Sequence, residues 1–196
     1  MDVHFLSEVY RGELGDKRLD VERLKKARPD FLVGVTEFQT GKGTFLDAKK
    51  ESTIDAIQAS CAAPILYRTP PTIINDTHYV DGSPAMPFPV HEIVERYNPT
   101  HVLVFANCAK EHSRPFSRHA LEQVLATSLP KPLREALLSR DERFDDNHAF
   151  LKKSGIPYLI LWSDKSLHTF TRNAKKVAAA ADRAEKHLRG LIAMQK

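Results

Sequence analysis

The stretch His78-Tyr79-Val80-Asp81-Gly82-Ser83-Pro84 places a carboxylate directly after a short run of strand-forming residues. Tyrosine and valine favour strands, whereas Asp-Gly is among the commonest turn dipeptides. Glycine lets the backbone turn sharply, so Asp81 can project from a loop at the end of a strand. Taken alone, this stretch predicts either an ordinary turn or one half of an active site.

A β-hairpin leads into this stretch. Ile73 and Ile74 supply strand propensity on one side, and Asn75-Asp76 supplies the turn before the second strand. Six of the twelve prolines lie between Pro64 and Pro89. The sequence therefore predicts that the hairpin is surrounded by irregular loops stiffened by proline.

Upstream, residues 31–38 form a continuous β-branched and apolar run that predicts a buried strand. The turn around Gly41 then leads into residues 44–47, which predicts a second hairpin. Ser52 can cap a helix that runs to about Cys61. Ile54, Ile57 and Cys61 recur at spacings of three and four, so they are expected to form its packed face.

Downstream, apolar runs alternate with helical patterns. The expected elements are a helix after Pro89, a strand over 101–106, two helical segments between about 119 and 153, a strand over 157–162 and a helix over about 171–194. Strands separated by helices imply a layered α/β sheet with parallel crossovers. No linker interrupts the pattern, so residues 1–196 are expected to form one domain with a helical region from about residue 110.

Composition excludes several classes of protein. At 42% hydrophobic and 28% charged residues, the chain resembles an ordinary soluble domain. The longest apolar run has seven residues, well below the roughly 20 needed to span a bilayer. The N-terminus is polar and acidic, unlike a signal peptide. A cytoplasmic protein is expected, which would contact a membrane surface only transiently, as a peripheral protein.

Charge and metal-ligand patterns are also informative. The net charge is +4, but the basic residues are spread along the chain, so no nucleic-acid partner is expected. Cys61 and Cys108 lie far apart and predict free thiols. The nine histidines form no helical ligand pair, and His78 is expected to point away from Asp81. Neither a metal nor another cofactor is expected.

Four segments, in this order and spacing, resemble the C-terminal two-thirds of the bacterial patatin-like phospholipase domain. They are Thr36-Glu-Phe-Gln-Thr-Gly41, Ala59-Ser-Cys-Ala-Ala-Pro64, Tyr79-Val-Asp-Gly82 and Pro87-Phe-Pro-Val90. The family pattern is T-D-x-x-T-G, A-S-x-A-x-P, Y-x-D-G-G and a short L-P-V run. Glu37 stands where the family often has aspartate. The resemblance extends over about residues 3–97 and implies a three-layer α/β sheet flanked by helices.

The resemblance also implies site residues. In that family a serine in G-x-S-x-G is the nucleophile, and an aspartate in D-G-G or D-G-A is its base. Carried over, Asp81 is the general base and Gly82 is the glycine of the turn. Ser83 departs from the usual glycine or alanine, which matters if that position needs a positive φ. Ser60, at the end of a helix, is expected to pack and cap rather than to act as a nucleophile.

The nucleophile motif does not occur in this sequence. No two of the eight glycines are four residues apart, so G-x-S-x-G is absent. We therefore expect an incomplete sheet and a chain that carries the catalytic aspartate but lacks the serine. A sheet with missing strands leaves an unpaired edge, so self-association is expected.

Two functions remain open at this stage. The first is a lipid acyl hydrolase of the phospholipase or esterase type, which acts on an acyl ester and is represented here by an inactive fragment. The alternative is a non-catalytic binding or interaction protein that keeps the same scaffold. An upstream in-frame G-x-S-x-G would favour the enzyme.

Overall fold

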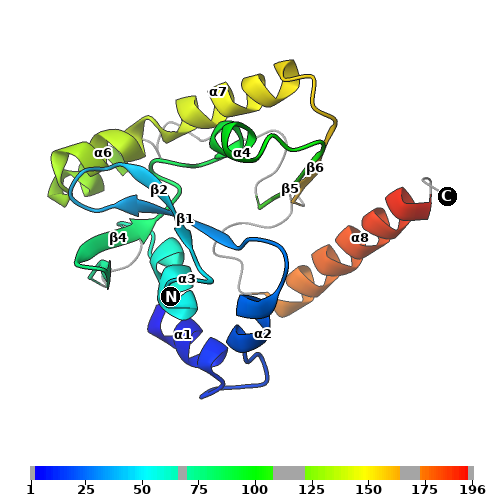
Figure 1. Ribbon diagram of the computed structural model, residues 1–196, viewed down its shortest axis with the longest axis horizontal. Coiled ribbons are helices and arrows are strands. Elements are labelled where there is room, and N and C mark those ends of the chain that lie inside the picture. Colours follow the sequence, from blue (N-terminus) through cyan, green and yellow to red (C-terminus); the bar gives the residue numbers. More distant parts are fainter. Residues whose placement is uncertain (1–2, 66–69, 108–121, 164–172, 194–196) are drawn as a thin grey trace. The chain divides into compact units, whose positions relative to one another are not determined.

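The structure is a computed structural model of the 196-residue chain, and it describes all residues except 1–2, 66–69, 108–121, 164–172 and 194–196 (Figure 1). The chain divides into two compact units. The first comprises Met1–Asn98 with Phe116–Ser154, and the second comprises Pro99–Pro115 with Gly155–Lys196. The single domain expected over residues 1–196 stays a prediction, and the expected start of the helical region near residue 110 lies outside the described residues.

The first unit is built on a four-stranded sheet with the order β2-β1-β4-β3 (Figure 1). The strands are β1 (Leu32–Glu37), β2 (Gly43–Asp47), β3 (Thr72–Ile74) and β4 (Thr77–Asp81). Both predicted hairpins are confirmed, and Asn75 and Asp76 turn with φ values of 50° and 61°. All pairings in this sheet are antiparallel, so the expected parallel crossovers are wrong here. The α/β fold class is confirmed.

Helix α3 (Thr53–Cys61) packs its small residues against this sheet. Thr53, Ala56 and Ala59 are its buried residues, whereas the predicted face of Ile54, Ile57 and Cys61 is only partly buried. Small side chains let the helix approach the strands closely, and Ile57 of the predicted face also packs against the core cluster. The core cluster consists of Val33, Val35, Leu46, Ala48, Ala56, Ala59 and Ile74.

Two short helices precede the sheet. Helix α1 (Val3–Arg11) contacts α3, and its buried Ser7 hydroxyl donates a hydrogen bond to the Gln58 side chain. Helix α2 (Val21–Lys26) begins at Asp20, whose carboxylate accepts the Arg23 backbone N–H at 2.9 Å. That contact satisfies one of the donors that every helix N-terminus leaves open.

Further helices of the first unit follow β4. They are α4 (Val90–Tyr97), the 3-10 turn η1 (Ala126–Ser128), α6 (Lys131–Leu138) and α7 (Arg140–Lys153). Helices α4 and α7 pack together, and the rings of Phe88 and Phe144 lie 5.1 Å apart between their centroids. Leu133 of α6 and Leu151 of α7 are fully buried. Both helices therefore bury apolar side chains within the unit.

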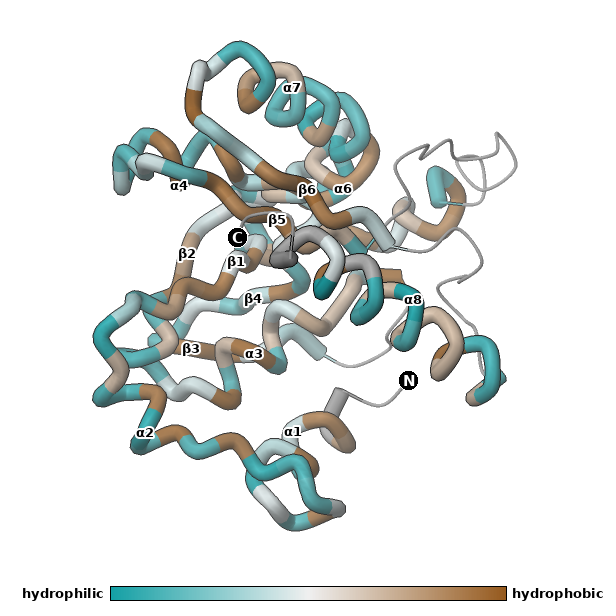
Figure 2. The backbone as a smooth tube through the Cα atoms, turned by 90° about the vertical axis from the view of Figure 1, so that its right-hand side faces the viewer, coloured by the Kyte–Doolittle hydropathy of each residue, from teal (hydrophilic) through white to brown (hydrophobic). Residues whose placement is uncertain are grey.

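The second unit contains the parallel strands β5 (Val102–Ala106) and β6 (Tyr158–Trp162) and the helix α8 (Ala174–Ala193). Both strands are markedly hydrophobic (Figure 2). The Val102 N–H donates to the Pro157 carbonyl at 2.9 Å. The predicted strands and final helix are confirmed, and this pair has the parallel arrangement that the sequence predicted.

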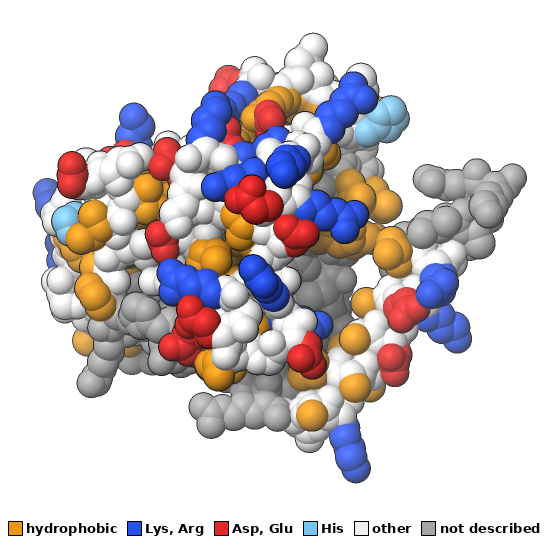
Figure 3. All heavy atoms as spheres, turned by 60° about the horizontal axis from the view of Figure 1, so that its bottom comes forward, with side chains coloured by type: hydrophobic (Ala, Val, Ile, Leu, Met, Phe, Trp, Pro, Cys, Tyr) orange, Lys and Arg blue, Asp and Glu red, His pale blue; other side chains and the backbone are white. Residues whose placement is uncertain are grey.

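Basic and acidic side chains are interspersed on the face drawn in Figure 3. On α8, Arg189 pairs with Glu185 at 2.7 Å. None of the helices among the described residues combines the length and apolar character needed to cross a membrane.

Candidate active site

Asp81 is the last residue of β4 and is fixed by backbone contacts on both sides. It lies opposite Val35 in the register of β1 and β4. Its N–H donates to the carbonyl of Ala62, just beyond α3, at 3.1 Å. The sheet and the end of α3 together therefore set where the Asp81 side chain leaves the backbone.

The Asp81 carboxyl is removed from full solvent contact. Burial raises its pKa above the ordinary 3.8, because a charged carboxylate loses hydration there. Ser83 opposes this shift through its backbone N–H, which donates to Asp81 Oδ1 at 2.6 Å, and through its side chain. The pKa remains raised, so Asp81 is a stronger base than a solvated aspartate.

Gly82 is required by a close backbone approach. A Cβ at this position would lie 2.5 Å from the carbonyl oxygen of Gly34 in β1. Neither Gly82 nor Ser83 has a positive φ. The reason for glycine expected from the sequence, a freely turning backbone, therefore differs from the reason that the structure gives. Ser83 in place of glycine or alanine adopts an ordinary backbone conformation.

Thr36 of β1 holds the loop after Asp81 from the side of the sheet. Its side chain is fully buried, and its hydroxyl donates to the Gly82 carbonyl at 3.3 Å and accepts from the Ala85 N–H at 3.4 Å. The Met86 N–H also donates to the Gly82 carbonyl, at 2.7 Å. The loop is therefore an ordered turn over the end of β1.

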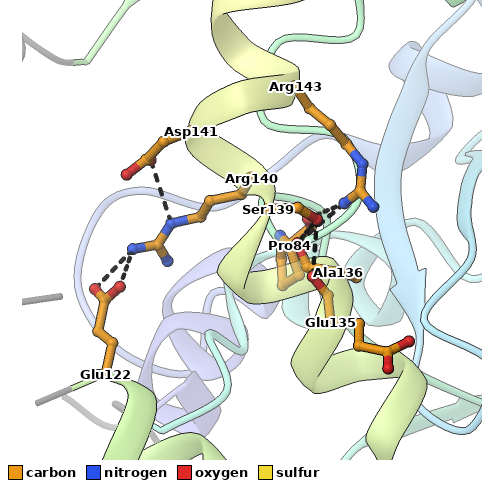
Figure 4. Close-up of polar contacts among 8 residues, drawn as sticks. All are labelled: Pro84, Glu122, Glu135, Ala136, Ser139, Arg140, Asp141 and Arg143. Carbon is orange, nitrogen blue, oxygen red and sulfur yellow. Dashed lines mark hydrogen bonds and ion pairs between the residues drawn. The ribbon is translucent and has the colours of Figure 1, made fainter. Parts of the chain in front are cut away.

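Arg143 of α7 holds the same loop from the side of the helices (Figure 4). Its Nη1 donates to the carbonyls of Pro84 and Ala136, at 3.0 Å each. One turn earlier, Arg140 instead forms a paired contact of 2.6 Å with both carboxylate oxygens of Glu122. No sequence motif singled out Arg143, because its role depends on a contact between residues 59 positions apart.

Residues 1–94 match the family model described as patatin-like phospholipase. Over these residues the chain is similar to the patatin-like phospholipase family. No curated protein and no solved structure gave a match. The matched range contains the whole four-stranded sheet and the Asp81 loop, whereas α6 and α7 lie beyond it. The similarity is therefore to a family described by phospholipase activity, and it covers residues 1–94.

Two side chains with nucleophilic groups, Cys61 and Ser60, lie at the end of α3. The Cys61 thiol is free, and burial, with a further contribution from the Asp81 carboxylate, raises its pKa, so it stays protonated at neutral pH. The Ser60 hydroxyl donates to the Ile57 carbonyl at 3.2 Å, as its expected capping role requires. Cys108, also predicted to be a free thiol, lies outside the described residues.

The His78 side chain is exposed, and in the register of β3 and β4 the residue lies opposite Ile73. Side chains alternate across a strand, so His78 and Asp81, three positions apart, leave opposite faces of β4. Among the described residues, no group of three or more histidine, cysteine, aspartate or glutamate side chains is placed to hold a metal ion.

Proposed function

We propose that this chain carries the general base of a patatin-like lipid acyl hydrolase, that Asp81 is that base, and that its partner is a serine. The observation that supports this most is the environment of Asp81. Within the patatin-like region, its carboxyl is partly desolvated, anchored by Ser83 and placed on a loop that Thr36 orders. A solvated turn aspartate would need none of these features.

The chemistry requires a base in direct contact with the attacking hydroxyl. A serine hydroxyl about 2.6–3.2 Å from the Asp81 carboxylate would transfer its proton as its oxygen attacks the ester carbonyl. Asp81 would return that proton to the leaving alcohol. Water would then give a proton to Asp81 and attack the acyl-enzyme. Asp81 would pass that proton to the serine oxygen as the fatty acid is released, which restores both the serine and the carboxylate. Because catalysis is most efficient with a base pKa near the working pH, the raised pKa favours Asp81 in this role.

The serine is proposed to come from outside the 196 residues, because no G-x-S-x-G occurs among them. The chain would then be the base-carrying part of the hydrolase and would be inactive alone. Its substrate would be a phospholipid or another acyl ester presented at a lipid surface, with the protein acting from the cytoplasm. An edge left unpaired would favour association with the nucleophile-carrying segment or with a second copy.

The test compares Asp81→Asn with the matched control Asp76→Asn in the protein that includes the nucleophile segment. Asp76 lies in the exposed hairpin turn with a positive φ, which asparagine tolerates. Release of fatty acid from phospholipid vesicles and from a short-chain nitrophenyl ester is measured. Loss of a general base lowers turnover about 10²–10⁴-fold, so Asp81→Asn should show that loss and Asp76→Asn should not.

An Asp81→Asn protein that retained turnover within about threefold of the parent would overturn the proposal, given the magnitude expected for a general base. If the parent protein hydrolysed neither substrate yet bound the vesicles, the non-catalytic binding function would replace it.

A further inference from the structure

We propose that Arg143 is a positioning residue for Asp81, acting through the Pro84 carbonyl. The geometry connects α7, which lies outside the patatin-like match, to the loop that carries the proposed base. The catalytic part of this inference rests on the proposed function, whereas its structural part does not.

The contact joins three elements at one nitrogen (Figure 4). Arg143 Nη1 lies 3.0 Å from the carbonyl oxygens of both Pro84, in the Asp81 loop, and Ala136, in α6. The Pro84 ring is fully buried, so this residue is held within the protein and not in solvent. Hydrogen bonds from a charged guanidinium are stronger than those between neutral groups. Arg143 therefore fixes the end of the loop that begins at Asp81.

The loop is otherwise held from the opposite side. Thr36 reaches Gly82 and Ala85 from β1, and the Ser83 N–H is bonded to Asp81 itself. Removing the Arg143 contact would leave these sheet-side tethers intact but free the Pro84 end. The expected result is a looser turn, with Asp81 less closely held, rather than an unfolded one.

Helix α7 does not depend on Arg143 for its place in the unit. Phe144 stacks near Phe88, and the Asn147 side chain accepts the His91 N–H at 3.2 Å. Leu151, two turns further on, is fully buried. A variant at Arg143 should therefore keep the helix docked and lose only the link to the loop.

Arg140 provides a matched control on the same helix. It is also an arginine in a largely buried contact, but its partner is Glu122 and not the loop. If positioning matters, Arg143→Gln and Arg140→Gln should differ at the loop even when they lower thermal stability equally. Arg143→Lys retains a charged donor, and since only Nη1 makes both contacts, a lysine nitrogen can replace part of them.

The first measurement is amide hydrogen exchange by NMR in the 196-residue chain. The Ser83 and Met86 amides, which donate to Asp81 and Gly82, report directly on the loop. Arg143→Gln should speed their exchange by at least about tenfold, relative to amides of β2, because the local opening becomes easier. Arg143→Lys should restore part of the protection, and Arg140→Gln should leave these two amides unchanged.

The second measurement is the split between kcat and KM in the hydrolase that contains the nucleophile segment. Misplacing a catalytic group by about 1 Å can cost 10²-fold, so Arg143→Gln should lower kcat by about 10–100-fold. KM should stay within about twofold, because Arg143 contacts backbone carbonyls and is not proposed to touch substrate. Partial recovery in Arg143→Lys is expected.

Unchanged exchange at Ser83 and Met86 in Arg143→Gln would overturn the inference whatever the hydrolase assay shows. The same holds if Arg140→Gln reproduces both effects, since general weakening of α7 would then explain them. Failure of the proposed function is separate, because it appears as turnover retained in Asp81→Asn while the exchange results stand.

Discussion

The four-stranded sheet and the β5–β6 pair are made from similarly hydrophobic residues, yet they are buried very differently. Val33, Val35, Leu46, Ile74 and Val80 of the larger sheet are all buried. In the β5–β6 pair none of the ten residues is buried, and Leu103 and Phe105 are 56% and 69% exposed. Figure 2 shows the hydrophobic character of both strands of the pair.

The difference shows that a hydrophobic strand gains stability only from what packs against it. The larger sheet has α3 on one face and the loops after β4 held over the end of β1. This packing is also what partly desolvates Asp81 and forces glycine at position 82. The region that is tightly packed is therefore also the one that carries the proposed active site.

The largest expected effect on stability comes from adding a side chain where Gly82 packs closely against β1. Gly82→Ala would place a Cβ 2.5 Å from the Gly34 carbonyl, and backbone atoms cannot rotate away. Overpacking of this kind costs about 1–3 kcal/mol, and we expect the upper end for Gly82→Ala. The control is Gly155→Ala, where a Cβ would meet no atom within 4 Å and only the φ of +73° causes strain.

Thermal unfolding followed by circular dichroism compares the two variants. A larger loss of stability from Gly155→Ala than from Gly82→Ala would contradict the contrast between the two regions.

The second effect on stability comes from substitutions that remove apolar atoms. Val35→Ala deletes two methyl groups from a fully buried position, and we expect a loss of about 2 kcal/mol. Leu103→Ala deletes more atoms, but at a position 56% exposed, so a change within about 0.5 kcal/mol is expected. Chemical denaturation measures both free energies of unfolding. Equal losses would mean that β5 is covered as thoroughly as β1.

A smaller effect concerns the pH dependence of stability. Because the folded pKa of Asp81 is raised, the folded state binds more protons than the unfolded state just above pH 3.8. Stability therefore falls as pH rises from the unfolded to the folded pKa, and stays lower above it. Asp81→Asn removes this pH-dependent loss of stability. The melting temperature of the variant minus that of the parent should therefore increase as pH rises from the unfolded to the folded pKa of Asp81. A difference that shrank with increasing pH would show the opposite shift.

Local patterns were sufficient where neighbours in sequence decide the structure. The Asn75-Asp76 turn, the hairpin around Gly41 and the helix after Pro89 were all predicted from turn chemistry and propensity. The parallel crossovers were confirmed for β5 and β6 but were wrong for the four-stranded sheet. The buried residues of α3 were missed because Ala56 and Ala59 carry no strong periodic signal.

The site residues also divide into those that the sequence indicated and those that it missed. Local sequence and a family resemblance singled out Asp81, Gly82 and Ser83, but they explained Gly82 by a sharp turn and missed the reason that the structure shows. Only the approach of Gly34 from another strand supplies that reason. Arg143 was missed entirely, since its contact with Pro84 joins distant parts of the chain and α7 is charged around its whole circumference.

We propose that the packed sheet makes Asp81 a partly desolvated, positioned base rather than an ordinary turn carboxylate. A carbon-13 NMR titration of the Asp81 side-chain carboxyl in this chain tests it most directly, with the exposed Asp76 as an internal reference. We expect an Asp81 pKa above the ordinary 3.8. An Asp81 pKa at or below that value would contradict it.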